Sequence, residues 1–83
     1  MDEKTLSDLV TDSLTKVAPD IDRNLLDADM NFRDQFEIDS VDFLGFVLDL
    51  EKKLGIKIPE VDYPKLSSMN GCLTHLGPLL NER

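Results

Sequence analysis

Cysteine, histidine and basic residues are scarce in this 83-residue sequence, and each shortage removes a class of function. The single cysteine, Cys72, excludes an intramolecular disulfide framework and a zinc site built from several cysteines. Nine Lys and Arg residues stand against seventeen Asp and Glu residues, which gives a formal net charge of −8. This balance opposes binding to nucleic acids and to anionic membranes, because both require an excess of positive charge.

The sequence also lacks a long apolar run. Its most apolar stretch, 41–50, is interrupted by Asp42 and Asp49, so we expect no insertion into a membrane. The start, Met1-Asp2-Glu3-Lys4, is polar and acidic overall and has no apolar region, so we expect no secretory signal and a cytoplasmic location. A chain of this length fits one domain, 1–83, and is too short to enclose a conventional enzyme cleft. We expect a monomer.

Residues for catalysis or metal binding do not form a recognisable set. Residues 20–24 imitate the start of a calcium-binding EF-hand loop, but Leu25 and Asn31 stand where that loop needs Gly and Glu. The sole histidine, His75, would have to serve any Ser-His-Asp relay, and Ser40 lacks the Gly-x-Ser-x-Gly elbow of hydrolases. We therefore expect no catalytic residues, no metal ligands and no enzymatic activity.

Apolar spacing predicts a first helix at about 5–17, followed by a long loop. Thr5 and Asp8 resemble a capping box, and Pro19 ends the helix. The apolar stripe of this helix consists of Leu6, Leu9, Val10, Leu14 and Val17. Residues 18–38 show no period, and we expect their scattered apolar side chains to pack back onto the core.

The strongest helical segment is predicted at about 40–54. Asp39 and Ser40 are good N-caps, Asp42 places negative charge in the first turn, and Gly55 is a natural terminator. Its apolar residues cover an arc of roughly 220°, which predicts a central helix that touches several neighbours.

The C-terminal third predicts a connector, a short helical turn and a last helix. The connector spans 56–59, the turn starts at Pro59 and is limited by Pro64, and Ser67 or Ser68 caps the last helix. Gly77-Pro78 is expected to break or kink that helix. The predicted fold is a small all-α bundle of three main helices plus one short helix, with a long loop between the first two helices.

Negative charge is concentrated in the first half of the chain. Residues 1–42 hold twelve acids and four bases, whereas residues 43–83 hold five of each. The acids either form a solvated surface or create a field that steers basic partners to one end of the molecule. Ser40 lies where this acidic segment meets the apolar helix. Taken alone, 39–42 is a capped helix start, but a serine there is reachable by another protein, and a helix N-terminus suits a phosphate ester.

With these features the sequence resembles the acyl carrier proteins over about residues 5–77. Asp39-Ser40-Val41 is close to the family's Asp-Ser-Leu, and Phe32, Leu50-Glu51 and Ile58-Pro59 follow its pattern. The resemblance implies that Ser40 accepts 4′-phosphopantetheine from coenzyme A through a separate phosphopantetheinyl transferase. The thiol of that arm then carries acyl groups as thioesters, and the carrier is a phosphoprotein, not a catalyst.

The resemblance also implies partners and contact residues. The partners are an acyl-loading ligase or acyltransferase and synthase enzymes with basic docking surfaces, in fatty-acid, polyketide or related biosynthesis. The residues that match partner-docking positions are Asp39, Val41, Asp42 and Glu51. Those that match an acyl-sheltering pocket, with plain core packing as the alternative for each, are Phe32, Leu44, Val47, Leu48, Leu50, Ile58, Leu66 and Cys72.

Departures from the family pattern predict a specialised carrier with its own partners. Gln35-Phe36-Glu37 replaces the common Asp-Leu-Gly, Gly45 stands where an acid is common, and Lys52 and Lys53 follow Glu51. The bulky side chains of Phe43, Phe46 and Tyr63 favour short acyl or aminoacyl cargo. Two alternatives stay open: an aminoacyl or peptidyl carrier for nonribosomal or cell-wall chemistry, and an acidic helical adaptor that is never modified.

Overall fold

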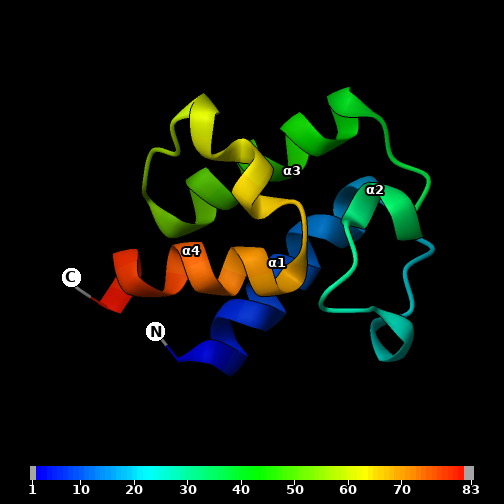
Figure 1. The fold of residues 1–83 in the computed structure, drawn as a ribbon, viewed down its shortest axis with the longest axis horizontal. Helices are drawn as coiled ribbons and strands as arrows, with labels where there is room; N and C mark the ends of the chain where they lie inside the picture. The colour runs from blue at the N-terminus through cyan, green and yellow to red at the C-terminus, as the bar shows by residue number, and fades with distance from the viewer. Residues whose placement is uncertain (1, 82–83) are drawn as a thin grey trace.

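Three long helices form the body of the molecule in the computed structural model, which describes residues 2–81. They are α1 (Glu3–Val17), α3 (Ser40–Leu54) and α4 (Met69–Asn81). Helix α1 contacts both α3 and α4 and runs antiparallel to each of them (Figure 1). The predicted all-α bundle is therefore confirmed for the described part of the chain. None of its helices is both long and apolar enough to cross a membrane.

The buried core lies between the three long helices and the segments that connect them. Its aromatic centre is an edge-to-face contact between Phe32 and Phe46, with ring centroids 5.5 Å apart and planes at 76°. The remaining members are aliphatic or sulfur-containing side chains: Leu6, Val10, Leu14, Ile38, Val47, Leu50, Leu54, Ile58, Leu66, Met69, Cys72 and Leu76. The core thus joins every helix except η1, the short helix introduced below.

Helix α1 begins two residues earlier than predicted. Asp2 is its N-cap, because its Oδ1 accepts a hydrogen bond of 2.7 Å from the N–H of Thr5. The predicted capping box of Thr5 and Asp8 was therefore wrong. Asp2 lies just upstream of the predicted start, and its side chain satisfies one of the free N–H groups of the first turn. The end at Val17 and the buried apolar stripe agree with the prediction.

Helix α3 has the predicted bounds but not the predicted degree of burial. It ends at Gly55, whose φ of +66° is a left-handed conformation that glycine adopts without steric cost. Only one side of its apolar arc packs into the core. Val41, Leu44 and Leu48 are 76%, 42% and 50% exposed, so this helix is less central than its apolar arc indicated.

The connection between α1 and α3 contains two short helices that periodicity did not reveal. They are the 3-10 helix η1 (Arg23–Leu25) and the single-turn helix α2 (Phe32–Gln35). Phe32 is fully buried, and its N–H donates a 2.7 Å hydrogen bond to the carbonyl of Ser67. The expected packing of this segment holds for its half-buried members Ile21, Leu26 and Phe36, whereas Leu25 and Met30 are exposed.

The C-terminal third departs from its prediction at both prolines. The 3-10 helix η2 (Glu60–Leu66) runs through Pro64, and α4 continues through Pro78. Pro78 is exposed, while Leu76 and Leu80 pack on the core on either side of it, so side-chain packing holds the helix together across the proline. Ser68 supplies the predicted cap, because its Oγ accepts a 3.0 Å hydrogen bond from the N–H of Gly71.

Candidate functional site

Ser40 is the first residue of α3 and is exposed to solvent. Its neighbours form a reciprocal capping box. The N–H of Asp42 donates to Asp39 Oδ1 at 2.9 Å, and the N–H of Asp39 donates to Asp42 Oδ2 at 3.2 Å. Both carboxylates are therefore held at fixed places beside the serine. The hydroxyl is accessible to another molecule and lies at the positive end of the helix dipole.

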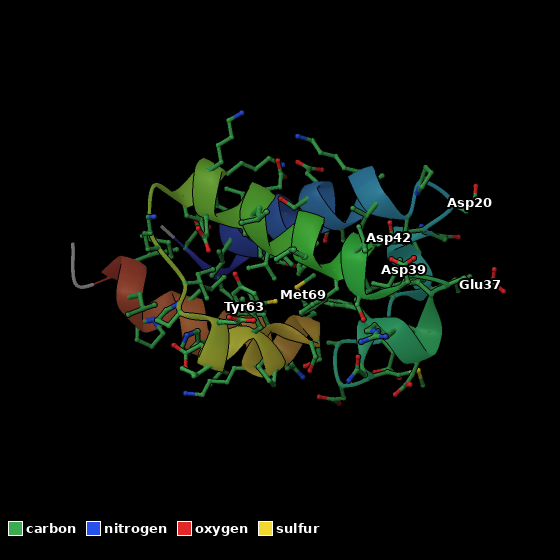
Figure 2. The ribbon with its side chains drawn as sticks, turned by 90° about the horizontal axis from the view of Figure 1, so that it is seen from above. Asp20, Glu37, Asp39, Asp42, Tyr63 and Met69 are labelled. Atoms are coloured by element: carbon green, nitrogen blue, oxygen red, sulfur yellow. The ribbon has the colours of Figure 1, made fainter. Side chains whose placement is uncertain are left out.

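The acidic residues around this turn share one end of the molecule. Figure 2 shows Asp20, Glu37, Asp39 and Asp42 together at that end. A shallow hollow of about 450 Å³ lies beside the capping box, and its acidic lining residues are Asp34, Glu37, Asp39 and Asp42. Exposed carboxylates in this density produce a local negative potential, which raises the local concentration of cationic surfaces. No group of three or more His, Cys, Asp or Glu side chains in residues 2–81 is arranged to hold a metal ion.

A second hollow is lined by Ser40 itself and differs in chemistry from the first. It has a volume of about 470 Å³ and lies between α2, the start of α3 and η2. Its apolar walls are the rings of Phe43 and Tyr63 and the side chains of Leu44 and Pro64. Its other walls are polar or charged side chains: Asn31, Arg33, Glu60 and Ser67. We call this hollow the Ser40 groove. It offers a chain attached at Ser40 both an apolar floor and hydrogen-bonding groups.

The eight residues that match the acyl-sheltering positions separate into two groups. Leu44 lines the Ser40 groove, and Leu48 is half exposed one turn further along α3. The other six belong to the core, with at most 7% exposure: Phe32, Val47, Leu50, Ile58, Leu66 and Cys72. Their packing against each other accounts for their burial without any ligand, so contact with cargo stays a prediction for them.

The four residues that match docking positions also differ in their surroundings. Asp39 and Val41 are exposed, and Asp42 is half-buried. Glu51 is turned toward the protein itself, because its Oε1 accepts a 3.3 Å hydrogen bond from the N–H of Ile58. That contact braces the turn that follows α3. Docking by Glu51 would have to compete with it.

Electrostatic contacts in the second half of α3 are internal. Asp49 forms ion pairs with Lys16 of α1 and with Lys53, each at 3.1 Å. The buried hydroxyl of Ser13 and these two ammonium groups lower the pKa of Asp49 to about 2. This carboxylate links α1 to α3 and is not available to a partner in the way that Asp39 is.

The single cysteine and the single histidine both have contacts elsewhere in the protein, and neither lines the Ser40 groove. Burial raises the pKa of the Cys72 thiol to about 12, and the thiol donates to the carbonyl of Leu66 at 3.3 Å. Nε2 of His75 lies 3.6 Å from a carboxylate oxygen of Asp62. A thiol that stays protonated is no nucleophile, so Cys72 is a core residue.

Two residues of α2 that sequence reasoning did not select shape the site. The side-chain oxygen of Gln35 accepts from the N–H of Asp27 at 3.0 Å, and its amide nitrogen donates to the carbonyls of Asp27 and Met30, each at 2.9 Å. This amide therefore stabilises the loop at residues 27–30. Arg33 lines both hollows beside Ser40. Neither role has a signal in residue spacing.

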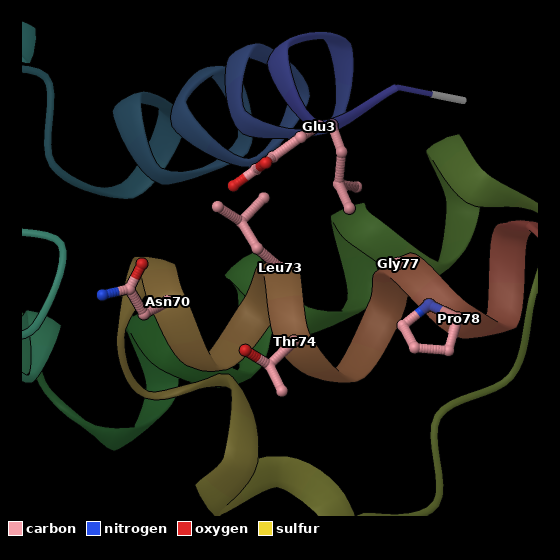
Figure 3. Close-up of a pocket in the computed structure, with 7 residues that line it drawn as sticks. Glu3, Asn70, Leu73, Thr74, Gly77 and Pro78 are labelled. Carbon is pink, nitrogen blue, oxygen red and sulfur yellow. The ribbon is translucent and has the colours of Figure 1, made fainter.

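One further hollow lies away from the predicted site residues. It has a volume of about 360 Å³ between α1 and α4, where Glu3 faces Leu73 and Asn70 (Figure 3). None of its lining residues belongs to the predicted site, so the features that point to function gather around the first turn of α3.

Comparison with known proteins agrees with the sequence pattern. Residues 4–73 match the family described as the phosphopantetheine attachment site. An acyl carrier protein of Lactobacillus johnsonii is 36% identical over 56 residues, which cover 68% of this chain and 70% of that protein. An acyl carrier protein of Lactobacillus acidophilus is 24% identical over 71 residues, which cover 86% of this chain and 82% of that protein. The chain therefore belongs to the acyl carrier protein family: it is a phosphopantetheine-bearing carrier and not a catalyst.

Proposed function

We propose that Ser40 is the residue that bears the phosphopantetheine arm. The Oγ of Ser40 would attack the pantetheine-side phosphorus of coenzyme A, forming a phosphodiester. The pyrophosphate bond would break, adenosine 3′,5′-bisphosphate would leave, and the serine proton would pass to the transferase. The arm supplies a terminal thiol that holds an acyl group as a thioester. The observation that carries this proposal is the exposed hydroxyl at the first residue of α3, between two fixed carboxylates.

The residues around Ser40 fit such a group. A phosphodiester at this position meets the N–H groups of the first helical turn, which have no partner within a helix, although Asp39 already accepts the N–H of Asp42. The Ser40 groove begins at the same residue and has a mixed lining suited to a chain with amide and methyl groups. The exposed Ser40 side chain leaves room for a transferase to bring coenzyme A to it.

We infer that the partners of this carrier are enzymes with basic docking surfaces. They would include a phosphopantetheinyl transferase, an acyl-loading ligase or acyltransferase, and downstream synthase enzymes of fatty-acid, polyketide or related biosynthesis. The carboxylates of Asp39 and Asp42 would attract these surfaces, and the exposed stripe of Val41, Leu44 and Leu48 would supply apolar contact. A cytoplasmic location is proposed for this carrier together with these enzymes.

The packing beneath the Ser40 groove supports a short cargo. The ring of Phe43 lies 5.9 Å from that of Phe46, which in turn packs on Phe32. Phe43 lines the groove and leads to the buried rings of Phe46 and Phe32, so a long chain that entered the core beside Phe43 would have to displace buried aromatic side chains. A short acyl group is therefore the proposed cargo, and an aminoacyl or peptidyl group of similar size is the second candidate.

Modification of Ser40 is tested by intact mass. Apo-protein incubated with coenzyme A and a broad-specificity phosphopantetheinyl transferase should gain the mass of one phosphopantetheinyl group. Ser40→Ala should gain nothing, while Ser67→Ala, which removes another hydroxyl from the same groove, should still be modified. Absence of the gain in the wild type, or a gain in Ser40→Ala, would contradict the proposal.

A further inference from the structure

Among the described residues that line the Ser40 groove, Arg33 is the one that carries a positive charge. It also lines the acidic hollow beside the capping box, so it lies at the boundary between the two hollows. Its backbone is held by its neighbours, because Phe32 is fully buried and Asn31 Oδ1 accepts the N–H of Arg33 at 3.2 Å, while its side chain is exposed. Within residues 2–81 the guanidinium forms no ion pair.

The negative charge around Ser40 explains why a cation at Arg33 would affect a phosphate attached to the serine. Asp39 and Asp42 flank the serine, and Asp34 and Glu37 line the same acidic hollow. A phosphodiester on Ser40 adds one more negative charge to this cluster. Like charges on neighbouring residues repel each other, and the repulsion would drive the arm away from the protein surface unless a cation offsets it. Arg33 is the cation at the right place.

We propose that Arg33 pairs with the phosphate attached to Ser40 and thereby directs the arm into the Ser40 groove. This inference rests on the proposed attachment at Ser40. A guanidinium presents parallel N–H donors that match two oxygens of a phosphate group, so the pair is both charged and directional. From a phosphate held at Arg33, the chain continues over Phe43, Leu44 and Tyr63 instead of over the acidic hollow, and Glu60 is the one acid among the described lining residues of the groove. Arg33 is thus a positioning residue for the arm.

The competing explanation is that Arg33 only neutralises the neighbouring carboxylates. In that case its effect is the same with and without the arm. Pairing with the phosphate predicts an effect in the modified protein alone. The difference between the holo and apo forms of each variant therefore separates the two explanations.

The experiment compares apo and holo forms of the wild type, Arg33→Gln, Arg33→Lys and Lys57→Gln. Lys57→Gln makes the same change in charge beyond the far end of α3, about 20 Å away by helix length. Intact mass first establishes complete modification of every holo sample. The midpoint of thermal unfolding and the NMR resonance of the Arg33 Nε–H group are then measured in both forms.

The pairing predicts that the Arg33 Nε–H resonance shifts between apo and holo wild type. For each protein we subtract the unfolding midpoint of the apo form from that of the holo form. This difference should be about 2–5 °C smaller in Arg33→Gln than in the wild type. It should be partly restored in Arg33→Lys and unchanged in Lys57→Gln. An unmoved resonance together with equal differences in all variants overturns the role of Arg33. Intact mass tests attachment of the arm independently of Arg33. If the wild type is never modified, the proposed function is overturned, and not only the role of Arg33.

Discussion

The first turn of α3 and the core between α1, α3 and α4 contain similar residue types in opposite settings. At the first turn, an exposed and a half-buried carboxylate flank an exposed serine, and three apolar side chains remain uncovered from there to Leu48. In and around the core, a carboxylate is paired with two lysines, and the thiol and the aromatic rings are buried. The comparison shows that one end of a single helix is left available to other molecules while the rest of it stabilises the fold.

Thiol reactivity should separate the two regions most strongly. With the pKa of Cys72 raised from an ordinary 9.0 to about 12, its thiolate fraction near pH 8 is lower by about 1,000-fold. Folded apo-protein should therefore be almost inert to a thiol-specific reagent, whereas holo-protein should react with one equivalent at the arm. Unfolding in urea should expose Cys72 as a control. Rapid reaction of the folded apo-protein would contradict its placement in the core.

Truncation of apolar side chains on α3 should distinguish buried from exposed positions. Phe46→Ala removes a fully buried ring and should lower the free energy of unfolding by about 3–5 kcal/mol. Leu48→Ala, two residues away and half exposed, should lower it by less than about 1 kcal/mol. Urea unfolding monitored by circular dichroism measures both. Similar losses in the two variants would refute the assignment of one face of α3 to the core.

Acid should weaken the link between α1 and α3. The pKa of Asp49 is lowered in the folded state to about 2, so this residue stabilises the fold above about pH 4 and the contribution is lost as pH falls from about 4 to 2. Asp49→Asn should reduce the free energy of unfolding at pH 7 by at most about 2 kcal/mol and flatten its dependence on pH in that range.

The control for the acid experiment is Asp8→Asn, an exposed acid of α1 whose substitution should change stability by less than about 0.5 kcal/mol. Denaturant unfolding at several pH values measures these effects. If Asp49→Asn kept the full acid sensitivity of the wild type, the ion pairs with Lys16 and Lys53 would not be the cause.

Charge at the first turn should affect encounter with partners more than stability. Asp39→Asn keeps a good N-cap but removes one charge beside Ser40, so modification by the transferase should slow by about 3- to 10-fold at low salt. Added salt should slow the wild type toward the rate of the variant through screening. Asp8→Asn is again the matched control. Equal rates for Asp39→Asn and the wild type at low salt would remove the steering role of this carboxylate.

Local signals made α3 and the candidate site predictable from the sequence. Asp39 and Asp42 at the start and Gly55 at the end fixed its bounds, because caps act within a few residues. The same reasoning failed at Pro78, where contacts of Leu76 and Leu80 with the core outweigh the lost backbone hydrogen bond.

Features that depend on residues distant in sequence were not predictable. Helix α2 is held by the bond from Phe32 to Ser67, and the network of Gln35 joins atoms five and eight residues away. A Cβ atom at Gly71 would lie 2.3 Å from the carbonyl oxygen of Lys65, so this glycine allows η2 to approach α4 closely. The spacing of apolar residues does not predict such contacts. It also does not predict that Arg33 lies beside Ser40.

The most direct test of the account is the intact mass of the protein purified from its native cell, followed by fragmentation that locates any added group. The account predicts one phosphopantetheinyl group on Ser40, with or without a short acyl or aminoacyl group on its thiol. Two results would contradict this assignment. One is a protein without added mass when it is purified from cells that express it, and the other is an added group on a residue other than Ser40.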